Sequence, residues 1–406
     1  MRASLACRRL RPCGVSRWQP RCFSVTVDDE SKKRVKPIVP LDYTDYTAVS
    51  NVASGLSKAR LSGFVAITAF AGYAATGAPL ATVECAAVTG GVFLMSAAAN
   101  TLNQIREVDR DAKMMRTVNR AMPSQKCTRT EALGFAALSS TVGTAALSLC
   151  SPISAGLGAA NLALYAGLYT GMKPQSEWNT WVGAVVGGVP PLIGWAAAGS
   201  AFDTPEPWCL AAALYLWQFP HFFALAWVHR VDYARGGFQM VPVNDPEGER
   251  TSKLIWNYSL YSCALPVVAV ASGATSAMFA VEGAALNVAL LAFAYKFKRD
   301  RSNENARNVF RITLAYLPLL LFFFVLHSKR LKSSQKDGAE ETLMGQFKIS
   351  LETALKPLRA LGKAACPHEV IVADHIQRRN TNEELAPTPF CPAVSADQKA
   401  DAPKAD

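Results

Sequence analysis

Three oxygen-bearing side chains recur four residues apart in one polar stretch of the chain. Asn103, Glu107 and Asp111 occupy positions i, i+4 and i+8, so on an α-helix they fall within an arc of roughly 80°. Amide and carboxylate oxygens are the ligands that Mg²⁺ prefers in proteins. Arg116 and Arg120 follow, also four residues apart, and a guanidinium can bind a phosphate with two parallel hydrogen bonds. The stretch predicts a magnesium-dependent site for a phosphorylated lipid; the alternative is an ordinary charged helix end in solvent.

A second polar stretch supplies another acid and two more arginines. Asp232 is predicted to hold a second Mg²⁺ opposite the first stretch, and Arg230 and Arg235 beside it are predicted to contact a diphosphate.

His221 lies inside an otherwise apolar segment, where an ionisable side chain is costly and usually functional; a histidine paired with a neighbouring carbonyl is the alternative. Lys173 is the only cation in its loop. It is predicted to reach the phosphates, unless it merely sets the membrane topology.

A third stretch, residues 169–195, is rich in glycine and contains two consecutive prolines. Pro190-Pro191 will kink or break a helix, and a membrane helix tolerates such a break where the freed carbonyls line a cavity. The glycines would let a neighbouring helix or a bulky flat ligand approach closely. They are Gly183, Gly187, Gly188 and Gly194.

Long apolar segments must position these motifs. The chain has 406 residues, and its mean hydropathy is above zero (+0.12) although both ends are polar. About nine segments come close to the ~20 apolar residues that a bilayer-spanning helix needs. We therefore predict an all-α, polytopic membrane protein; a large soluble helical protein is the alternative. The predicted cores of the spans are 61–77, 80–99, 133–150, 153–172, 181–198, 210–228, 255–271, 277–294 and 309–326.

Positive charge alternates between the connections of these spans. Those after the second, fourth, sixth and eighth spans carry Lys or Arg, whereas those after the first, third, fifth and seventh carry none. Because the bias of Lys and Arg sets the orientation of a polytopic protein, the two large polar motifs should face the same side. Lys329, Arg330 and Lys332 after the last span break this pattern.

The ends of the chain differ from the apolar middle. The first 27 residues hold six arginines and no acid, which is typical of a mitochondrial transit peptide; a disordered basic tail is the alternative. Without these arginines the formal net charge falls from +11 to about +5, so nucleic acid is not an expected partner. We predict a transit peptide (1–27), a polar segment (28–60), a catalytic membrane domain (61–328) and a polar, largely disordered tail (329–406). The ten cysteines lack zinc-type spacing.

Taken together, these stretches resemble the UbiA-type intramembrane prenyltransferases, and within them the subgroup that acts on haem. The first motif of that family places Asn and two acids four residues apart, followed by Arg-Thr-x-Asn-Arg. This run is residues 103–120 here, with Ala121-Met122 in place of Pro-Leu. The similarity extends over residues 61–326. The further matching runs are Asn179-Thr180-Trp181, Pro190-Pro191 with Gly194-Trp195, Pro220-His221-Phe222 and Asp232-Tyr233.

The resemblance implies a fold, a reaction and its ligands. Nine helices would surround a central cavity, with magnesium-bound farnesyl diphosphate at its matrix mouth. The farnesyl group would be joined to a vinyl group of haem B, with water adding a hydroxyl. The implied location is the mitochondrial inner membrane, which the chain would cross several times, and haem A synthase is a candidate partner.

A reaction of this kind also needs a dry chamber. Ionisation of an allylic diphosphate gives a carbocation that must be kept from bulk water by an apolar, aromatic-lined cavity; a belt at the lipid interface is the alternative role for such side chains. His221 is the candidate contact for the haem iron or a propionate. The candidate aromatic wall residues are Trp181, Trp195, Trp217, Phe222, Phe223, Trp227 and Tyr233.

Other functions remain open at this point. A quinone-pathway prenyltransferase acting on an aromatic acid would use the same diphosphate site with a different acceptor pocket. A transporter could use the polar motifs as a substrate gate, although no inverted repeat is evident. A structural assembly subunit would have no reason to carry clustered acids and arginines. In the tail, Cys366-Pro367 and Cys391-Pro392 resemble short haem-sensing motifs, but two chance pairs are the simpler interpretation.

Overall fold

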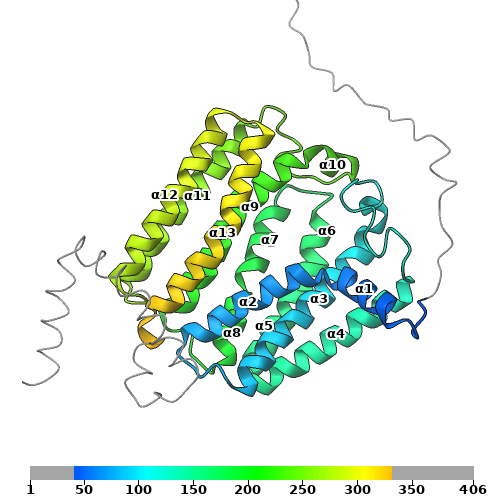
Figure 1. Cartoon of the computed structure of the whole chain (residues 1–406), viewed down its shortest axis with the longest axis horizontal. Coiled ribbons are helices and arrows are strands. Elements are labelled where there is room, and N and C mark those ends of the chain that lie inside the picture. Colours follow the sequence, from blue (N-terminus) through cyan, green and yellow to red (C-terminus); the bar gives the residue numbers. More distant parts are fainter. Residues whose placement is uncertain (1–40, 332–406) are drawn as a thin grey trace, which may run out of the picture. The chain divides into compact units, whose positions relative to one another are not determined.

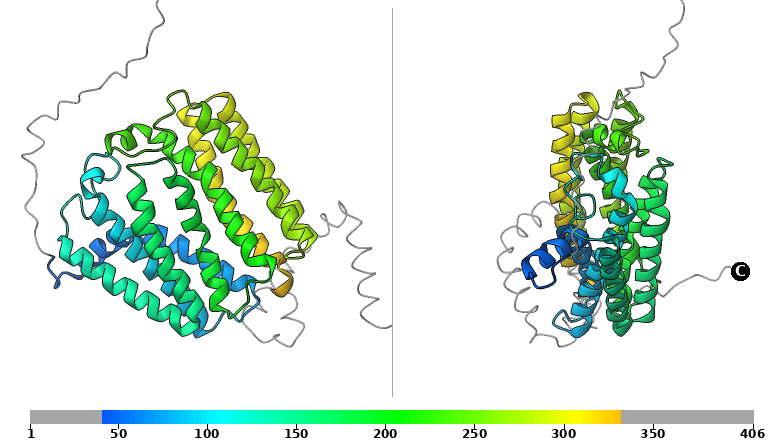
Figure 2. Two further views of the ribbon diagram at one scale, coloured as in Figure 1. Left: turned by 180° about the vertical axis from the view of Figure 1, so that it is seen from behind. Right: turned by 90° about the vertical axis from the view of Figure 1, so that its right-hand side faces the viewer.

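The computed structural model describes residues 41–331, which belong to one compact unit. Within this range the chain is helical and contains no β-strand, only an isolated antiparallel bridge between Thr275 and Ser328. The helices lie side by side (Figures 1 and 2), and the predicted all-α class is confirmed. The predicted transit peptide, the tail beyond residue 331 and its two Cys-Pro pairs lie outside the described residues.

Thirteen α-helices and one π-helical segment follow one another in the described range. They are α1 (Tyr46–Ser57), α2 (Ala59–Ala75), α3 (Val83–Asp111), α4 (Arg129–Cys150), α5 (Pro152–Ala163), η2 (Leu164–Tyr169), α6 (Thr170–Met172), α7 (Asn179–Gly188), α8 (Pro190–Ala197), α9 (Pro205–Val228), α10 (Arg230–Arg235), α11 (Glu249–Ala271), α12 (Ala277–Arg299) and α13 (Asn303–His327).

Each predicted membrane span overlaps a helical segment of the structure. Within the described residues, seven segments are long and apolar enough to cross a membrane: α3, α4, α7 with α8, α9, α11, α12 and α13. Helix α2 has only 17 residues, and the span predicted at 153–172 is divided by the π-helix η2. The seven segments support a multi-pass membrane protein, while the count of nine crossing helices stays a prediction.

Local sequence explains where several of these helices begin. The Thr128 hydroxyl accepts a hydrogen bond from the backbone N–H of Glu131, whose carboxylate accepts one from the backbone of Thr128 in return. The Ser151 hydroxyl caps α5, and Pro152 follows at the first helical position, where its missing N–H costs nothing. Further on, Pro190 opens α8 and separates it from α7, as the sequence predicted.

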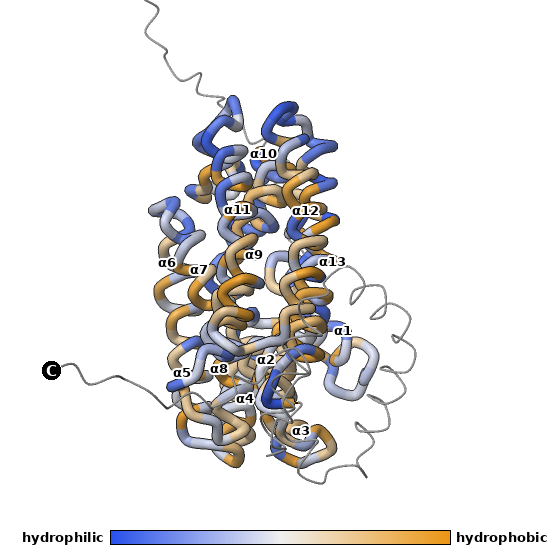
Figure 3. Tube along the Cα trace, turned by 90° about the vertical axis from the view of Figure 1, so that its left-hand side faces the viewer, coloured by the Kyte–Doolittle hydropathy of each residue, from blue (hydrophilic) through white to orange (hydrophobic). Residues whose placement is uncertain are grey.

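Polar residues gather at the end of the bundle that carries α10, whereas the middles of the long helices are mostly hydrophobic (Figure 3). One of the three cations that break the charge pattern, Arg330, lies at the opposite end. Arg330 follows the end of α13 and places Nε 3.4 Å from Oε1 of Glu206, in the first turn of α9. Its guanidinium also lies 5.1 Å from the ring centroid of Trp195. A cation at this end is therefore balanced by a nearby acid.

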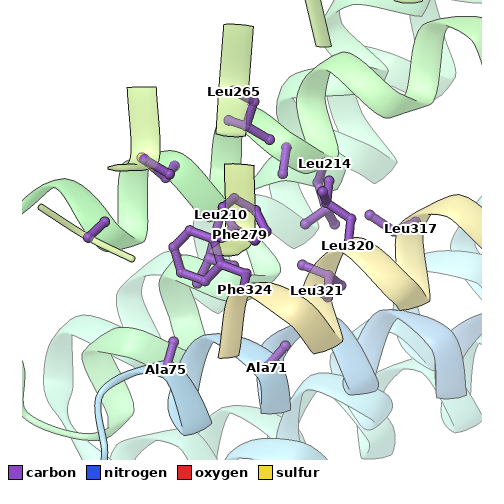
Figure 4. Close-up of a cluster of buried hydrophobic side chains, with 14 of the residues drawn as sticks. Ala71, Ala75, Leu210, Leu214, Leu265, Phe279, Leu317, Leu320, Leu321 and Phe324 are labelled. Carbon is purple, nitrogen blue, oxygen red and sulfur yellow. The ribbon is translucent and has the colours of Figure 1, made fainter. Parts of the chain in front are cut away.

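Close helix contacts hold the bundle together. A cluster of buried apolar side chains joins α2, α9, α11, α12 and α13, including Leu210, Phe279 and Phe324 (Figure 4). Helices α2 and α8 approach so closely that a Cβ added at Gly194 would lie 1.8 Å from the carbonyl oxygen of Ala69. Small residues at such crossings let membrane helices pack by backbone contact. This glycine therefore serves a neighbouring helix rather than a flat ligand.

Replacing Gly194 with alanine should destabilise the protein by about 1–3 kcal/mol, because the added methyl group must push α2 and α8 apart. The measurement is the midpoint of thermal unfolding of the protein in detergent. Gly134→Ala is the matched control, because Gly134 lies within α4 and no neighbouring atom of the described residues lies within 4 Å of a Cβ added there. Equal midpoints for the two variants would contradict the tight crossing of α2 and α8.

Candidate active site

The predicted oxygen face occupies the last turns of α3. Asn103, Glu107 and Asp111 are buried there, with exposed fractions of 1, 5 and 0%. Arg106 and Asp109 belong to the same part of α3 but are exposed. Most residues of this stretch are polar, but the three that are spaced four apart share one face of the helix, and that face is buried.

Both carboxylates on this face are paired with cations from other segments. Lys173, which follows α6, places Nζ 3.0 Å from Oε1 of Glu107. Arg120, in the loop after α3, places Nη1 2.7 Å from Oδ2 of Asp111. The other oxygen of Asp111, Oδ1, is buried and has no hydrogen-bond partner in the described part of the chain. Because leaving a buried acceptor unpaired costs free energy, this oxygen favours a bound ligand.

Asn103 is paired with a lysine that the sequence analysis missed. Lys58 donates from Nζ to Oδ1 of Asn103 at 3.2 Å, although the two residues are 45 positions apart. Its backbone has a left-handed φ of +46° and separates α1 from α2. Gln104 secures this break by donating to the carbonyl oxygens of Gly55 and Leu56, at 2.9 Å each. The packing of α1 against α3 therefore brings Lys58 to the site.

Positive charge is crowded around the oxygen face. Burial, reinforced by the nearby charges of Arg120 and Lys173, lowers the pKa of Lys58 to about 7, against the opposite influence of Glu107 and Asp111. Cations held this close repel one another, and an anion with several oxygens would relieve that repulsion. The arrangement is suited to binding a diphosphate.

The second polar stretch meets the loop that follows α3. Oδ2 of Asp232 accepts a hydrogen bond from the backbone N–H of Arg116 at 3.4 Å, and its Oδ1 lies 3.2 Å from Nη1 of Arg235. The Arg116 guanidinium donates to the Tyr233 hydroxyl at 3.2 Å. Two stretches separated by 116 positions therefore adjoin at one end of the bundle. Tyr233, predicted as a cavity wall, lies here in contact with Arg116.

Arg230, which was predicted to contact a diphosphate, bonds in this structure with residues of α9 and α13. Its Nη1 donates to the carbonyl oxygen of Trp227 at 2.8 Å and to Oδ1 of Asn303 at 2.9 Å. The guanidinium also lies 4.2 Å from the ring centroid of Trp227. Because α10 begins at this residue, the side chain turns back toward α9 and the start of α13.

The four predicted metal ligands are Asn103, Glu107, Asp111 and Asp232. Within residues 41–331, no group of three or more His, Cys, Asp or Glu side chains is gathered closely enough to hold a metal ion. The carboxylates bond with Lys and Arg side chains instead. The donor set still suits Mg²⁺, because it consists only of amide and carboxylate oxygens and one of them, Oδ1 of Asp111, has no hydrogen-bond partner in the described range.

A cavity of about 1210 Å³ lies beside this polar site. Its volume exceeds the roughly 300–1,000 Å³ of ordinary small-molecule pockets, and its lining is mostly apolar. Asn100 lies one helical turn before Asn103 and is part of the lining, as are Tyr165 and Tyr169. Lys173 links the two regions, because its Nζ lies 4.7 Å from the ring centroid of Tyr169. The cationic site and the apolar cavity therefore adjoin.

Aromatic side chains on α9 form part of the cavity wall. Trp217, His221 and Phe222 are among the lining residues, as is Phe219. His221 lies against Trp217, with ring centroids 4.5 Å apart and planes inclined by 23°. Sequence reasoning found His221 and Phe222 because they lie in a motif.

Other predicted wall residues lie elsewhere. Trp195 is fully buried, and its indole N–H donates to the carbonyl oxygen of Ala201 at 2.8 Å, so it is a core residue and not a wall of this cavity. Trp181 donates to the Tyr258 hydroxyl at 2.8 Å and packs among aromatic rings of α9 and α11. Phe223 and Trp227 are also buried in the core. A motif match alone does not tell a wall residue from a core residue.

Comparison with known proteins agrees with this arrangement. Residues 65–326 match the UbiA prenyltransferase family. Two solved structures share the fold: a digeranylgeranylglyceryl phosphate synthase (TM-score 0.57, 16% identity, covering 70% of this chain and 98% of the other) and a UbiA homologue from Aeropyrum pernix (TM-score 0.55, 17% identity, covering 66% and 98%). The chain belongs to the UbiA prenyltransferase family, and it is therefore an intramembrane prenyltransferase.

Relatives with higher sequence identity than these two structures share the name protoheme IX farnesyltransferase. A mitochondrial protoheme IX farnesyltransferase from Arabidopsis thaliana is 37% identical over 347 residues, which cover 84% of this chain and 76% of the relative. One from Yarrowia lipolytica is 37% identical over 289 residues, and the match covers 68% of this chain and 61% of that relative. A protoheme IX farnesyltransferase from Solibacter usitatus is 38% identical over 237 residues, covering 58% and 81%.

Proposed function

We propose that this chain transfers the farnesyl group of farnesyl diphosphate to a vinyl group of haem B and so makes haem O. The observation that carries this proposal is the contact between a cationic, oxygen-lined site and a large apolar cavity. Lys173 adjoins both, through Glu107 on one side and the Tyr169 ring on the other. The names of the plant, yeast and bacterial relatives support haem as the acceptor.

The diphosphate would lie against the cations that surround the α3 face. Lys58, Lys173 and Arg120 each contact one of the three predicted ligands on α3, and they can turn to an anion that offers more oxygens. Arg116 and Arg235 lie beside Asp232 and would bind the outer phosphate oxygens. These positively charged groups would neutralise the charge that develops as the diphosphate departs.

Divalent metal belongs to the same proposal. Asn103, Glu107, Asp111 and Asp232 would hold Mg²⁺ once their cationic partners have turned to the diphosphate. Bound there, Mg²⁺ would supply further positive charge to the leaving group. Oδ1 of Asp111, which bonds with no other described residue, is the position that best suits this role.

The cavity would protect the reactive fragment. The bond between the farnesyl carbon and the diphosphate oxygen breaks, and both electrons leave with the diphosphate. The vinyl π electrons of haem then attack the allylic cation, and water adds to the new cation and loses a proton to give the hydroxyl. Tyr165 and Tyr169 line the cavity, and the centroid of the Tyr169 ring lies 4.7 Å from Nζ of Lys173 and 5.2 Å from that of the Tyr165 ring. Their π faces would stabilise the allylic cation, and the apolar walls would limit water.

The proposed setting is the mitochondrial inner membrane, with the polar site facing the matrix. The relatives' mitochondrial names and the seven apolar helical segments support a mitochondrial multi-pass protein. The proposal that the polar site faces the matrix rests on the alternating charge of the connections between spans. Haem A synthase, which would act on the product, is the proposed partner.

The test is a reaction with purified full-length protein, farnesyl diphosphate and haem B, followed by mass spectrometry of the extracted porphyrins. Haem O should form with Mg²⁺ present, and chelation of the metal should abolish it. Formation of a prenylated aromatic acid instead would favour the quinone-pathway alternative. Uptake of substrate into vesicles without any product would favour a transporter.

A further inference from the structure

His221 is held on three sides by its neighbours. Its ring lies between Trp217, 4.5 Å away between centroids, and Phe310 of α13, 4.7 Å away. Its Nδ1 lies 2.9 Å from the hydroxyl oxygen of Thr313. Trp217 is itself tied to the same residue, because its indole N–H donates to the backbone carbonyl of Thr313 at 2.7 Å. The imidazole therefore has one fixed orientation.

The Thr313 hydroxyl determines which ring nitrogen carries the proton. This hydroxyl donates its only hydrogen to the carbonyl oxygen of Phe310, at 2.6 Å. A carbonyl cannot donate, so the Thr313 oxygen can only accept from His221, and Nδ1 must carry a hydrogen. In a neutral imidazole Nε2 then keeps its lone pair. No protein group within residues 41–331 bonds with Nε2, and the partly exposed ring lines the cavity.

We infer that Thr313 is a positioning residue, which holds His221 as the Nδ1–H tautomer so that Nε2 binds the haem iron rather than a propionate. A propionate is an acceptor and would need a hydrogen on Nε2, whereas iron needs the lone pair that this tautomer leaves free. Histidines that bind metals commonly donate their other ring N–H to a fixed acceptor, which sets tautomer and orientation. This inference rests on the proposed haem substrate.

Two porphyrins separate the iron contact from the propionate contact. The purified full-length protein is titrated with ferric haem B and with metal-free protoporphyrin IX, which has the same propionates and no iron. His221→Ala should weaken the binding of haem and leave the binding of protoporphyrin unchanged. Thr313→Val should weaken haem binding roughly tenfold, the loss typical when a metal-binding histidine loses its outer partner, and Thr313→Ser should restore it. Equal losses for both porphyrins would mean a propionate contact and overturn the inference.

Spectroscopy gives a readout that does not depend on turnover. Resonance Raman spectra of the ferrous haem complex should contain an iron–histidine band that is absent in His221→Ala and shifted in Thr313→Val. Thr89→Val is the matched control, because the Thr89 hydroxyl also donates to a carbonyl of its own helix, at 2.8 Å, but Thr89 does not line the cavity. An unshifted band in Thr313→Val, as in this control, would refute the positioning role.

A further variant keeps the test decisive if Thr313→Val fails to fold. His221→Gln offers an amide N–H that can donate to a propionate but ligates iron poorly, so unchanged haem affinity in this variant would overturn the inference. A wild-type protein that makes haem O without an iron–histidine band would refute only the iron contact. A wild-type protein that binds neither porphyrin would refute the proposed function as well.

Discussion

Replacing Asp111 with asparagine should reduce kcat/KM for farnesyl diphosphate by about 100- to 1000-fold, the range found when one preorganised electrostatic group is removed from an active site. Asp111 is fully buried and pairs with Arg120 through Oδ2, and its Oδ1 has no hydrogen-bond partner among residues 41–331. The amide keeps the shape of the side chain but removes the charge that would hold Mg²⁺. The measurement is the rate of haem O formation at several farnesyl diphosphate and Mg²⁺ concentrations.

Asp109→Asn is the matched control for this prediction. Asp109 lies two residues earlier in α3, and its replacement by asparagine removes the same charge. Asp109 is exposed, so it does not belong to the buried face. Its activity should stay close to that of the wild type. If both variants lost activity equally, the effect would come from the overall charge at this end of the bundle. Full activity of Asp111→Asn would contradict the assignment of the oxygen face.

Replacing Lys58 with methionine should lower kcat/KM for farnesyl diphosphate by about 100-fold, because the diphosphate loses one of three cations that surround the α3 face. Lys58 contacts Asn103 directly, and its pKa is lowered by burial and by the charges of Arg120 and Lys173. Methionine preserves much of the length and apolar stem of the side chain. Steady-state rates measured over a range of farnesyl diphosphate concentrations would detect the loss.

The control here is Arg60→Met, which removes a positive charge two residues further along the chain. Arg60 is exposed in the first turn of α2 and does not belong to the cations described around the α3 face. Its kcat/KM should change little. A similar loss in both variants would indicate long-range attraction of the substrate, which salt would screen, and it would remove Lys58 from the binding site.

Much of the candidate site could be predicted from local sequence patterns. Asn103, Glu107 and Asp111 could be assigned to one face because a helix repeats every 3.6 residues, and this geometry does not depend on the rest of the fold. The approximate positions of the long helices followed from apolar runs of bilayer length, although helices such as α3 extend beyond the predicted apolar cores. Pro190 marked a helix break for an equally local reason, because it has no N–H to donate.

Partners distant in sequence could not be derived in this way. Lys58 has no motif around it, and it reaches Asn103 only because α1 packs against α3 and Gln104 holds the end of α1. Arg230 looked equivalent to its neighbours in sequence, yet its position at the start of α10 turns it toward Asn303. In both cases the direction of a long side chain depends on the neighbouring helix.

Aromatic residues show the same limit. Trp195 and Trp217 were both expected to line the cavity, but only Trp217 does, since Trp195 bonds with Ala201 inside the core. A large apolar side chain has the same composition in a wall and in a core, so packing alone separates the two roles. The bond between Thr313 and His221 joins residues 92 positions apart and has no counterpart in any motif.

By itself the sequence determined the helical class, the apolar segments and the oxygen-bearing face of α3, because each depends on periodicity or composition within a few turns. It also carried the resemblance that led to the prenyltransferase family, which the comparison over residues 65–326 established. Only the tertiary structure decided which cations meet that face, which aromatic rings line the cavity and which nitrogen of His221 stays free. Those outcomes depend on contacts between residues tens of positions apart, and such contacts exist only once the helices have packed.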